Sequence, residues 1–427
     1  MLTSFTIKNF MSILDATLHF SFAEGKAPNG YKKSVELIFC EPTKKQRIVP
    51  VMAIYGANAS GKTNIIKAMH AFKQIALGNI FGLYSPNRLI KPNDPMTLSC
   101  GFCAKKRSYV YSVTINKTGI LEEVLTCDSL EVFRIADGKC FFSHMTSSQV
   151  YTEEKLLEIF QVECTNESSV QIRTFLSRLG THYQKLNAAA FEAYFYLSNI
   201  EIYPQNRFPM SFGIERMQNL NKDTFENSLA DVAKLLKKLD IGIEGLSVDQ
   251  KQFENILEFI REQPFTHADS ILQKPQSPVI VANVIRSYHK DINGDLVEFI
   301  FNEDESDGTK VLAGLLGVFL FVLKRGDVLV IDELDKAMHP YIFEKIVSMF
   351  KDRDYNQNNA QLIFTAHDTD LLDTGAVRKS EVAIVDKTLK GGTSIHRIAE
   401  FSGIRNVTNF RRQYMLGTFG GIPHPYI

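Results

Sequence analysis

The chain has 427 residues, and its 48 Lys and Arg residues balance its 48 Asp and Glu residues, so the formal net charge is zero. At about 150 residues per domain, this length predicts two or three domains or one large elaborated domain. The charge balance gives no support for coating DNA through a strongly basic surface, but it leaves a local basic groove open. Apolar residues make up 44% of the chain, which is enough for a sizeable core and excludes wholesale disorder.

From the sequence we expect neither a membrane-spanning helix nor a secretory signal peptide. The longest apolar run, Val311 to Leu323, has thirteen residues, whereas a membrane-spanning helix needs roughly 20. The first residues lack the pattern of a secretory signal peptide. Six cysteines do not form a disulfide scaffold. We interpret the single CxxC pair, Cys100 and Cys103, as buried reduced thiols, with a metal or redox role as the weaker alternative. We expect a cytoplasmic protein with no membrane partner.

The first half of the chain alternates between strand and helix patterns. Period-two alternation predicts two strands in residues 2–22, with a turn near Ser12, and an antiparallel β segment over 97–150. A short apolar run at 50–55 predicts a buried strand, and helical spacing follows from Asn64 to Leu77. Further helices are expected within 153–200 and 224–239, and loops at 203–210 and 263–278.

The second half repeats strand and helix in turn. Strands are expected at 279–288, 296–301, 328–331, 361–365 and 381–386, and helices at 307–323 and 340–350, with a short helix after 365. This alternation predicts an α/β fold built on a mainly parallel sheet with helices on both faces.

A glycine-rich loop gives the strongest chemical signal. Residues 56–63, GANASGKT, fit the phosphate-loop pattern GxxxxGK[ST], with a buried strand before them and an amphipathic helix after them. The glycines let backbone amides turn toward phosphates, Lys62 supplies a positive charge, and the Thr63 hydroxyl is a ligand for Mg²⁺. A glycine turn that only caps a helix is the weaker alternative. The residues expected to contact the nucleotide are Asn58, Ala59, Ser60, Gly61, Lys62, Thr63 and Asn64.

Acidic and basic side chains follow two later strands. The apolar strand 328–331 ends in Asp332 and Glu333, where α/β sheets bind ligands. We expect Asp332 to be a Mg²⁺ partner and Glu333 to orient or deprotonate the attacking water. Two solvated acids at the start of a loop are the alternative. His367 follows the strand 361–365, where it either contacts the γ-phosphate or simply begins a helix.

These motifs together resemble an ABC-type P-loop ATPase head of the SMC, RecF and OLD-like kind. The compact bacterial AAA family ATPases are most similar, including the ATPase subunits of the phage-defence systems AbiL, RloA and PARIS (AriA). The resemblance rests on motifs at 7–12, 55–64, 305–310, 328–340, 364–373 and 414–423. It implies a mixed sheet, an antiparallel β subdomain and a helical insertion, divided as an N-terminal ATPase lobe (1–150), a mainly helical insertion (151–278) and a C-terminal ATPase lobe (279–427).

The resemblance also assigns roles that spacing does not. Residues 305–309, ESDGT, stand where such proteins carry the signature motif, which closes over the nucleotide of a second subunit, so Ser306, Asp307 and Gly308 would bind ATP across a head-to-head dimer. Asp307 departs from the glycine of transporter proteins. Asp335 would couple the two sites, His367 would be the switch histidine, and His339 with Pro340 would start the next helix. The Q-loop glutamine is not placed, because Gln74 and Gln161 both lie in helical patterns.

Three functions follow from this resemblance. One is an ATPase with the cofactors ATP and Mg²⁺ whose turnover controls a separate Toprim-like nuclease effector in antiviral, abortive-infection defence. A second is a slowly hydrolysing sensor or scaffold, toxin–antitoxin-like, that holds this partner until a phage trigger protein or DNA arrives. The third is an SMC- or RecF-like ATPase of DNA repair or recombination.

Only about 60 residues follow His367, too few for a Toprim domain. Arg405, Arg411 and Arg412 form a small basic cluster, read either as a solvated face or as a nucleic-acid contact.

Overall fold

A computed structural model describes residues 1–22, 47–142, 153–166, 168, 170–184, 187–204, 222–253, 280–388, 392–401 and 409–423. The chain divides into two compact units, which are described separately. The first contains Met1–Gln205, Arg325–Lys336 and Phe343–Ile427, and the second contains Asn206–Lys324 and Ala337–Ile342. The expected boundaries near 150 and 278, most of the loop expected at 203–210, the loop expected at 263–278, and Arg405 lie outside the described residues, so the three-part division stays a prediction. Tyr203, expected at the start of the first of these loops, is instead the last residue of the strand Glu201–Tyr203.

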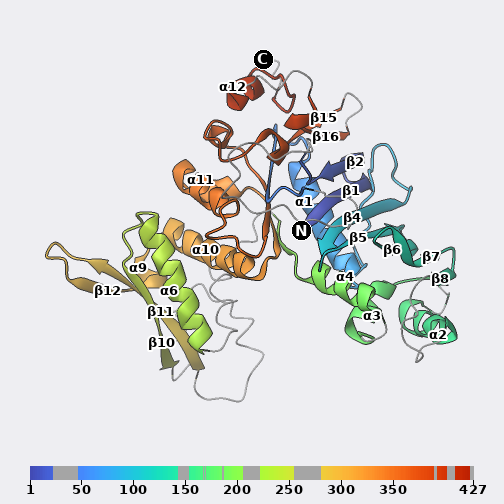
Figure 1. Cartoon of the computed structure of the whole chain (residues 1–427), viewed down its shortest axis with the longest axis horizontal. Coiled ribbons are helices and arrows are strands. Elements are labelled where there is room, and N and C mark those ends of the chain that lie inside the picture. Colours follow the sequence, from blue (N-terminus) through green and yellow to red (C-terminus); the bar gives the residue numbers. More distant parts are fainter. Residues whose placement is uncertain are drawn as a thin grey trace. The chain divides into compact units, whose positions relative to one another are not determined.

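A six-stranded sheet lies at the centre of the first unit (Figure 1). Neighbouring strands are parallel except for the last pair, β15 and β16, which confirms the expected mainly parallel sheet. The apolar strands are buried on both faces, as expected for parallel strands in an α/β fold. The strand order is β16 (Thr393–Arg397), β15 (Val382–Lys387), β3 (Val51–Gly56), β14 (Gln361–Thr365), β13 (Val328–Ile331) and β9 (Glu201–Tyr203).

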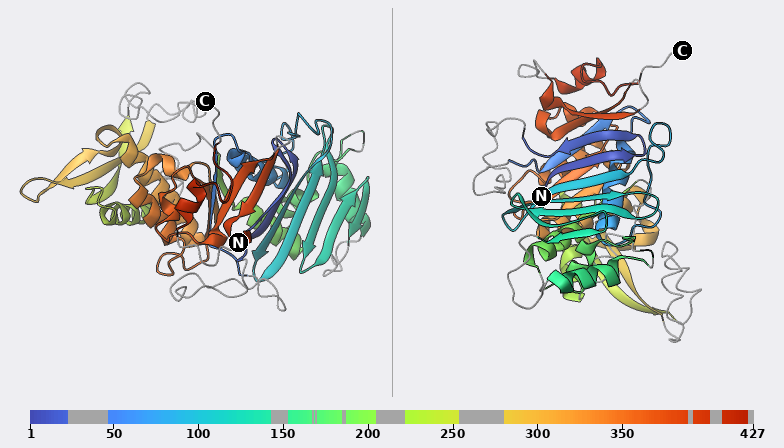
Figure 2. Two further views of the ribbon diagram at one scale, coloured as in Figure 1. Left: turned by 90° about the horizontal axis from the view of Figure 1, so that it is seen from above. Right: turned by 90° about the vertical axis from the view of Figure 1, so that its right-hand side faces the viewer.

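A second sheet of the same unit has seven strands, and every neighbouring pair is antiparallel. Figure 2 shows its strands side by side, in blue to green. Alternate residues face the core, as the period-two pattern predicts. The strand order is β2 (Ile13–His19), β1 (Leu2–Phe10), β4 (Met96–Ala104), β5 (Arg107–Ile115), β6 (Ile120–Cys127), β7 (Leu130–Ala136) and β8 (Lys139–Phe142).

Helix α1 (Lys62–Ala76) joins the two sheets into one core. Its apolar residues recur every three or four positions, and Phe72 packs against Phe5 of β1 and Tyr111 of β5, with ring centroids 5.5 and 5.8 Å apart. The helix begins two residues before the expected Asn64, because the phosphate loop leads straight into its first turn. The other helices are α2 (Glu153–Cys164), α3 (Phe175–Thr181), α4 (Ala188–Ser198), α11 (Pro340–Met349) and α12 (Phe410–Met415).

Helix α3 is fixed by a buried carboxylate from the antiparallel sheet. Glu123 of β6 is fully buried, and its oxygens accept the backbone N–H groups of Phe175 and Leu176 at 2.8 and 2.9 Å. The Tyr111 hydroxyl and the Gln171 side-chain amide donate to the same carboxylate at 3.0 and 2.6 Å. Burial raises the pKa of Glu123, and these four hydrogen bonds oppose the shift.

The second unit contains an antiparallel three-stranded sheet, β10 (Gly245–Phe253), β11 (Ile280–Lys290) and β12 (Leu296–Ile300). Helix α6 (Lys222–Lys238) contacts β10 and buries Leu229, Val232 and Leu236. The short α9 (Phe301–Asp304) leads into α10 (Asp307–Arg325), of which all but the last residue belongs to this unit.

The cysteine expectation is wrong at one position. Cys100 is buried and free, and burial raises the pKa of its thiol. Cys103 is disulfide-bonded, so the two cysteines of the CxxC pair do not bridge each other. Among the described residues, no group of three or more His, Cys, Asp or Glu side chains is arranged to hold a metal ion. No helix in the described part of the chain has the length and apolarity that crossing a membrane requires.

Candidate nucleotide-binding site

The phosphate loop, residues 56–63, connects β3 to α1 as predicted. A Cβ atom at Gly56 would lie 2.2 Å from the Val385 carbonyl oxygen, and one at Gly61 would lie 2.3 Å from Thr393 Oγ1. Gly61 also has φ +113°, which side chains rarely adopt. Both positions therefore require glycine, while Asn58 and Ala59 lie exposed at the outside of the loop.

Side chains from two distant elements and from the start of α1 hold this loop. Thr393 of β16 donates from Oγ1 to the Ser60 carbonyl oxygen at 2.9 Å and lies 2.7 Å from Ser12 Oγ. The Asn64 side chain donates to the same Ser12 Oγ at 2.7 Å. Ser12 belongs to the motif 7–12 on which the family resemblance partly rests. Its contact with Thr393 was not predicted, because the two residues are 381 positions apart and no local pattern links them.

Lys62 is buried, and its ammonium group lies within the loop. Nζ donates to the carbonyl oxygens of Gly56 and Ala57 at 2.7 and 3.2 Å. Burial lowers the pKa of Lys62, and the charges of Asp332 and Glu333 oppose this shift. The acidic residues that follow β13 thus act electrostatically on the lysine of the phosphate loop.

Asp332 follows β13 and is 5% exposed. Its Oδ1 accepts a hydrogen bond from Thr365 Oγ1 at 2.5 Å, whereas its Oδ2 is buried and has no hydrogen-bond partner. Thr365 also accepts the backbone N–H of Glu333 at 2.7 Å, so one hydroxyl fixes both acids. Thr365 was missed, because a threonine that ends an apolar strand looks like an ordinary strand residue.

Glu333 stands in the left-handed backbone region, with φ +54°. A non-glycine residue in this region is uncommon and is often part of a functional site. Its Oε1 lies 3.4 Å from His367 Nε2, and its Oε2 pairs with Lys336. This hydrogen bond raises the pKa of Lys336.

Asp335 connects the acidic strand to the loop that carries His367. Its Oδ2 accepts the backbone N–H groups of His367 and Asp368 at 2.7 and 2.6 Å, and its Oδ1 is buried without a partner. The structure therefore brings Glu333, Asp335 and His367 together, all of which are predicted site residues.

Buried polar atoms without partners gather around the C-terminal ends of these parallel strands. Buried polar groups in folded proteins nearly always have a partner, so a cluster of exceptions calls for an explanation. Unpaired carboxylate and hydroxyl oxygens beside a buried lysine are the chemistry that phosphate and Mg²⁺ would complete, so the residues present fit Mg²⁺ and ATP. The four atoms are Tyr55 Oη, Ser60 Oγ, Asp332 Oδ2 and Asp335 Oδ1.

The predicted signature residues lie in the second unit, at the start of α10. Ser306 Oγ accepts the Thr309 backbone N–H at 3.2 Å and lies 2.8 Å from Thr309 Oγ1, so Ser306 caps the helix as expected. Ser306, Asp307 and Gly308 are exposed. Pro340 is the first residue of α11, as predicted, and His339 Nδ1 accepts the Tyr341 N–H at 3.2 Å.

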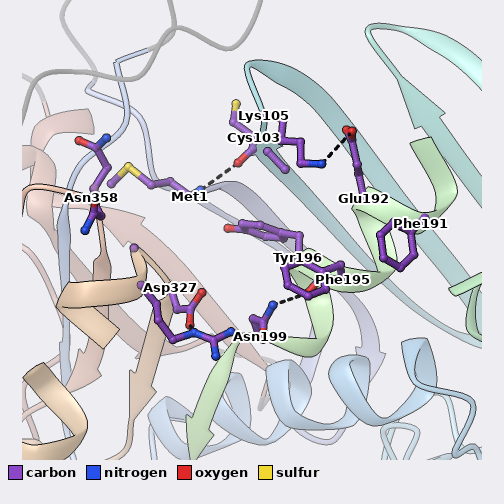
Figure 3. A pocket seen from close by; sticks show the side chains of 14 residues that line it. Met1, Cys103, Lys105, Phe191, Glu192, Phe195, Tyr196, Asn199, Asp327 and Asn358 are labelled. Atoms are coloured by element: carbon purple, nitrogen blue, oxygen red, sulfur yellow. Dashed lines mark hydrogen bonds and ion pairs between the residues drawn. The ribbon is translucent and has the colours of Figure 1, made fainter. Parts of the chain in front are cut away.

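A cavity of about 280 Å³ lies at the other end of the strands, beside the start of β13 (Figure 3). Phe191, Phe195 and Tyr196 of α4 line it, and none of the predicted site residues does. Its charged groups pair with one another, including Lys105 with Glu192 at 3.4 Å. This cavity is therefore distinct from the candidate nucleotide site.

The strand order and the site together define a class. The phosphate loop follows β3, the acidic pair follows β13, and β14, which leads to His367, lies between them. This arrangement is an ABC-type P-loop ATPase head. The family model described as "AAA domain, putative AbiEii toxin, Type IV TA system" matches residues 51–373, and the chain belongs to this family.

Solved SMC heads are similar to this chain at low sequence identity. An SMC head bound to the C-terminal winged-helix domain of ScpA is 15% identical, with a TM-score of 0.45, over 92% of this chain and 96% of that chain. The SMC head domain from Thermotoga maritima is 14% identical, with a TM-score of 0.43, over 93% and 98%. A Pyrococcus furiosus SMC head bound to the C-terminal domain of ScpA is 12% identical, with a TM-score of 0.42, over 98% and 99%. A comparison with curated proteins finds no significant match.

Proposed function

We propose that the first unit binds ATP with Mg²⁺ and hydrolyses it. The observation that carries this proposal is the buried, unpartnered Asp332 Oδ2 in the same site as a phosphate loop whose lysine is also buried. An isolated buried carboxylate oxygen is costly, so its retention favours a ligand that completes it. The Thr63 hydroxyl and Asp332 would hold Mg²⁺, which when bound would neutralise charge on the phosphates.

The residues of the chain divide the chemistry among them. Lys62 would exchange its bonds to the Gly56 and Ala57 carbonyls for the β- and γ-phosphates, and the amides of the phosphate loop would bind the same groups. Glu333 would orient the attacking water and accept its proton, because its carboxylate stands at the end of β13 with only 11% of its side chain exposed. His367, 3.4 Å from Glu333 Oε1, would report the presence of the γ-phosphate.

Dimerisation is the second part of the proposal. The exposed helix start at Ser306, Asp307 and Gly308 offers free amides to a phosphate, so the signature of one chain would close over the nucleotide of another. Asp335 already ties the acidic strand to the His367 loop through two hydrogen bonds. It would thereby couple the two nucleotide sites of a head-to-head dimer.

The biological role that we propose is control of a separate nuclease effector in antiviral defence, with this chain as sensor or scaffold. Two observations support a role of this kind: the family description names a toxin of a toxin–antitoxin system, and the zero net charge does not favour bulk DNA binding. A phage protein would be the trigger, and the effector would be Toprim-like.

The experiment is native mass spectrometry of Glu333→Gln protein purified from its own host with Mg²⁺ and ATP. The proposal predicts at least two copies of the chain, two nucleotides and a stoichiometric second polypeptide with nuclease activity. A dimer that carries nucleotide but no effector would keep the ATPase and remove the effector role. A chain without nucleotide would contradict the ATPase itself.

A further inference from the structure

The segment 409–423, here called the tail segment, lies against the candidate nucleotide site. It contains α12 (Phe410–Met415) and three glycines, Gly417, Gly420 and Gly421. The Asn409 side chain caps the helix by accepting the Arg412 N–H at 2.6 Å. Tyr414 and Phe419 are 6% and 2% exposed, so side chains of this segment are part of the core of the first unit.

The first contact reaches the strand of the phosphate loop. The Tyr414 ring lies 6.2 Å from that of Tyr55, the residue before Gly56, and the Tyr414 hydroxyl donates to the Gly421 carbonyl oxygen at 2.9 Å. A Cβ at Gly421 would lie 2.6 Å from Ile384 Cγ2 and 3.4 Å from Gly56 Cα. With φ +70°, Gly421 lets the backbone of the tail segment approach the first glycine of the phosphate loop.

The second contact reaches the loop that carries His367. Arg411 Nη2 pairs with Asp370 at 2.9 Å, and Nε donates to Thr369 Oγ1 at 3.1 Å. Its Nη1 lies 3.9 Å from Asp373. One guanidinium group therefore holds three residues of the segment 366–373, here called the His367 loop. Arg411 is thus paired with acidic residues, whereas the exposed side chain of Arg412 beside it has no partner among the described residues.

We propose that the tail segment positions the nucleotide site by linking the phosphate loop to the His367 loop, with Gly421 and Tyr414 acting on the first and Arg411 on the second. An exposed ion pair alone contributes little to stability. The role of Arg411 is therefore to position the His367 loop. It would hold His367 in contact with Glu333 and at the right distance from the phosphates bound by the phosphate loop. This inference rests on the proposed ATPase function.

The test compares Arg411→Ala with the matched control Arg412→Ala. We expect Arg411→Ala to lower kcat for ATP about tenfold at nearly unchanged ATP affinity, because a small misplacement of a catalytic loop is costly in rate. Arg412→Ala should behave as wild type.

Gly421→Ala should instead weaken ATP binding, because its methyl group would push the tail segment away from Gly56. A charge-exchanged pair, Asp370→Arg with Arg411→Asp, should recover part of the lost kcat.

Hydrogen–deuterium exchange without nucleotide separates this inference from the ATPase proposal. We expect faster exchange in residues 366–373 of Arg411→Ala and no change in Arg412→Ala, whether or not the protein hydrolyses ATP. If Arg411→Ala matches Arg412→Ala in both exchange and kcat, the positional role is wrong. If wild type neither binds nor hydrolyses ATP but the exchange difference remains, the proposed function fails while the structural link stands.

Discussion

Two buried carboxylates of the first unit use their oxygens differently. Glu123, in the antiparallel sheet, accepts four hydrogen bonds and ties β6 to the start of α3. Asp332, at the end of the parallel strand β13, has one oxygen bonded to Thr365 and one oxygen with no partner. A buried carboxylate whose oxygens are hydrogen-bonded can stabilise a fold, whereas a half-satisfied one costs stability. We propose that Asp332 is retained because a ligand completes it.

The largest expected effect tests the ligand side of this comparison. Lys62→Ala should abolish ATP binding, because the phosphates lose their main cationic partner in a site that already contains Asp332 and Glu333. Isothermal titration with Mg²⁺ and ATP measures this loss. Lys67→Ala, an exposed lysine on the same helix, is the control and should bind as wild type. Retained affinity in Lys62→Ala would refute the phosphate-loop assignment.

The next effect concerns the chemical step. Glu333→Gln should bind ATP normally and hydrolyse it about a hundredfold to a thousandfold more slowly, because the amide cannot accept the proton of the attacking water. Phosphate release under single-turnover conditions measures the rate. Turnover at the wild-type rate would exclude Glu333 as the base.

The structural carboxylate should show the opposite behaviour. Glu123→Ala should lower the free energy of unfolding by about 3 kcal/mol, since it leaves two helix N–H groups and two side-chain donors unpaired. Urea unfolding measures the change, and Glu122→Ala, whose side chain is 39% exposed, should stay within about 0.5 kcal/mol of wild type. Equal free energies of unfolding for the two variants would show that the Glu123 carboxylate does not stabilise the fold through its four hydrogen bonds.

A smaller effect is expected at the hydroxyl cluster behind the phosphate loop. Thr393→Val keeps the side-chain shape but removes the bonds to Ser12 and to the Ser60 carbonyl. We expect about fivefold weaker ATP binding, equivalent to about 1 kcal/mol for lost hydrogen bonds. Ser394→Ala, the neighbour on β16, should bind ATP as wild type, and an equal loss in both variants would mean that the strand, not the hydroxyl, is responsible.

The sequence predicted the parts of the site that depend on local order. The apolar run before Gly56 and the one before Asp332 each form a strand that ends at a loop, as the local pattern predicts. The roles of the loop residues in binding stay predictions. Helix α1 starts at Lys62, two residues before the predicted start, because the glycine-rich sequence of the phosphate loop resembles a turn and does not show where the helical backbone begins.

What the sequence could not predict are contacts between residues far apart in the chain. Thr393 meets Ser12, and Thr365 meets Asp332, only because strand order brings them together. Arg411 looked like part of a basic surface, yet it pairs with Asp370, since a charge count does not show which acids lie opposite. The half-satisfied state of Asp332 is a property of the packed site and has no sequence pattern of its own.

The most direct test of the central claim is urea unfolding of wild type and Asp332→Asn, each with and without Mg²⁺ and ATP. Without ligand, we predict that Asp332→Asn is at least as stable as wild type, because it replaces a buried carboxylate, one oxygen of which has no hydrogen-bond partner, with a neutral group. With ligand, wild type should gain clearly more stability than the variant, because only the carboxylate holds the metal. If Asp332→Asn is instead destabilised without ligand as strongly as Glu123→Ala, Asp332 is a structural residue and the nucleotide site is wrongly assigned.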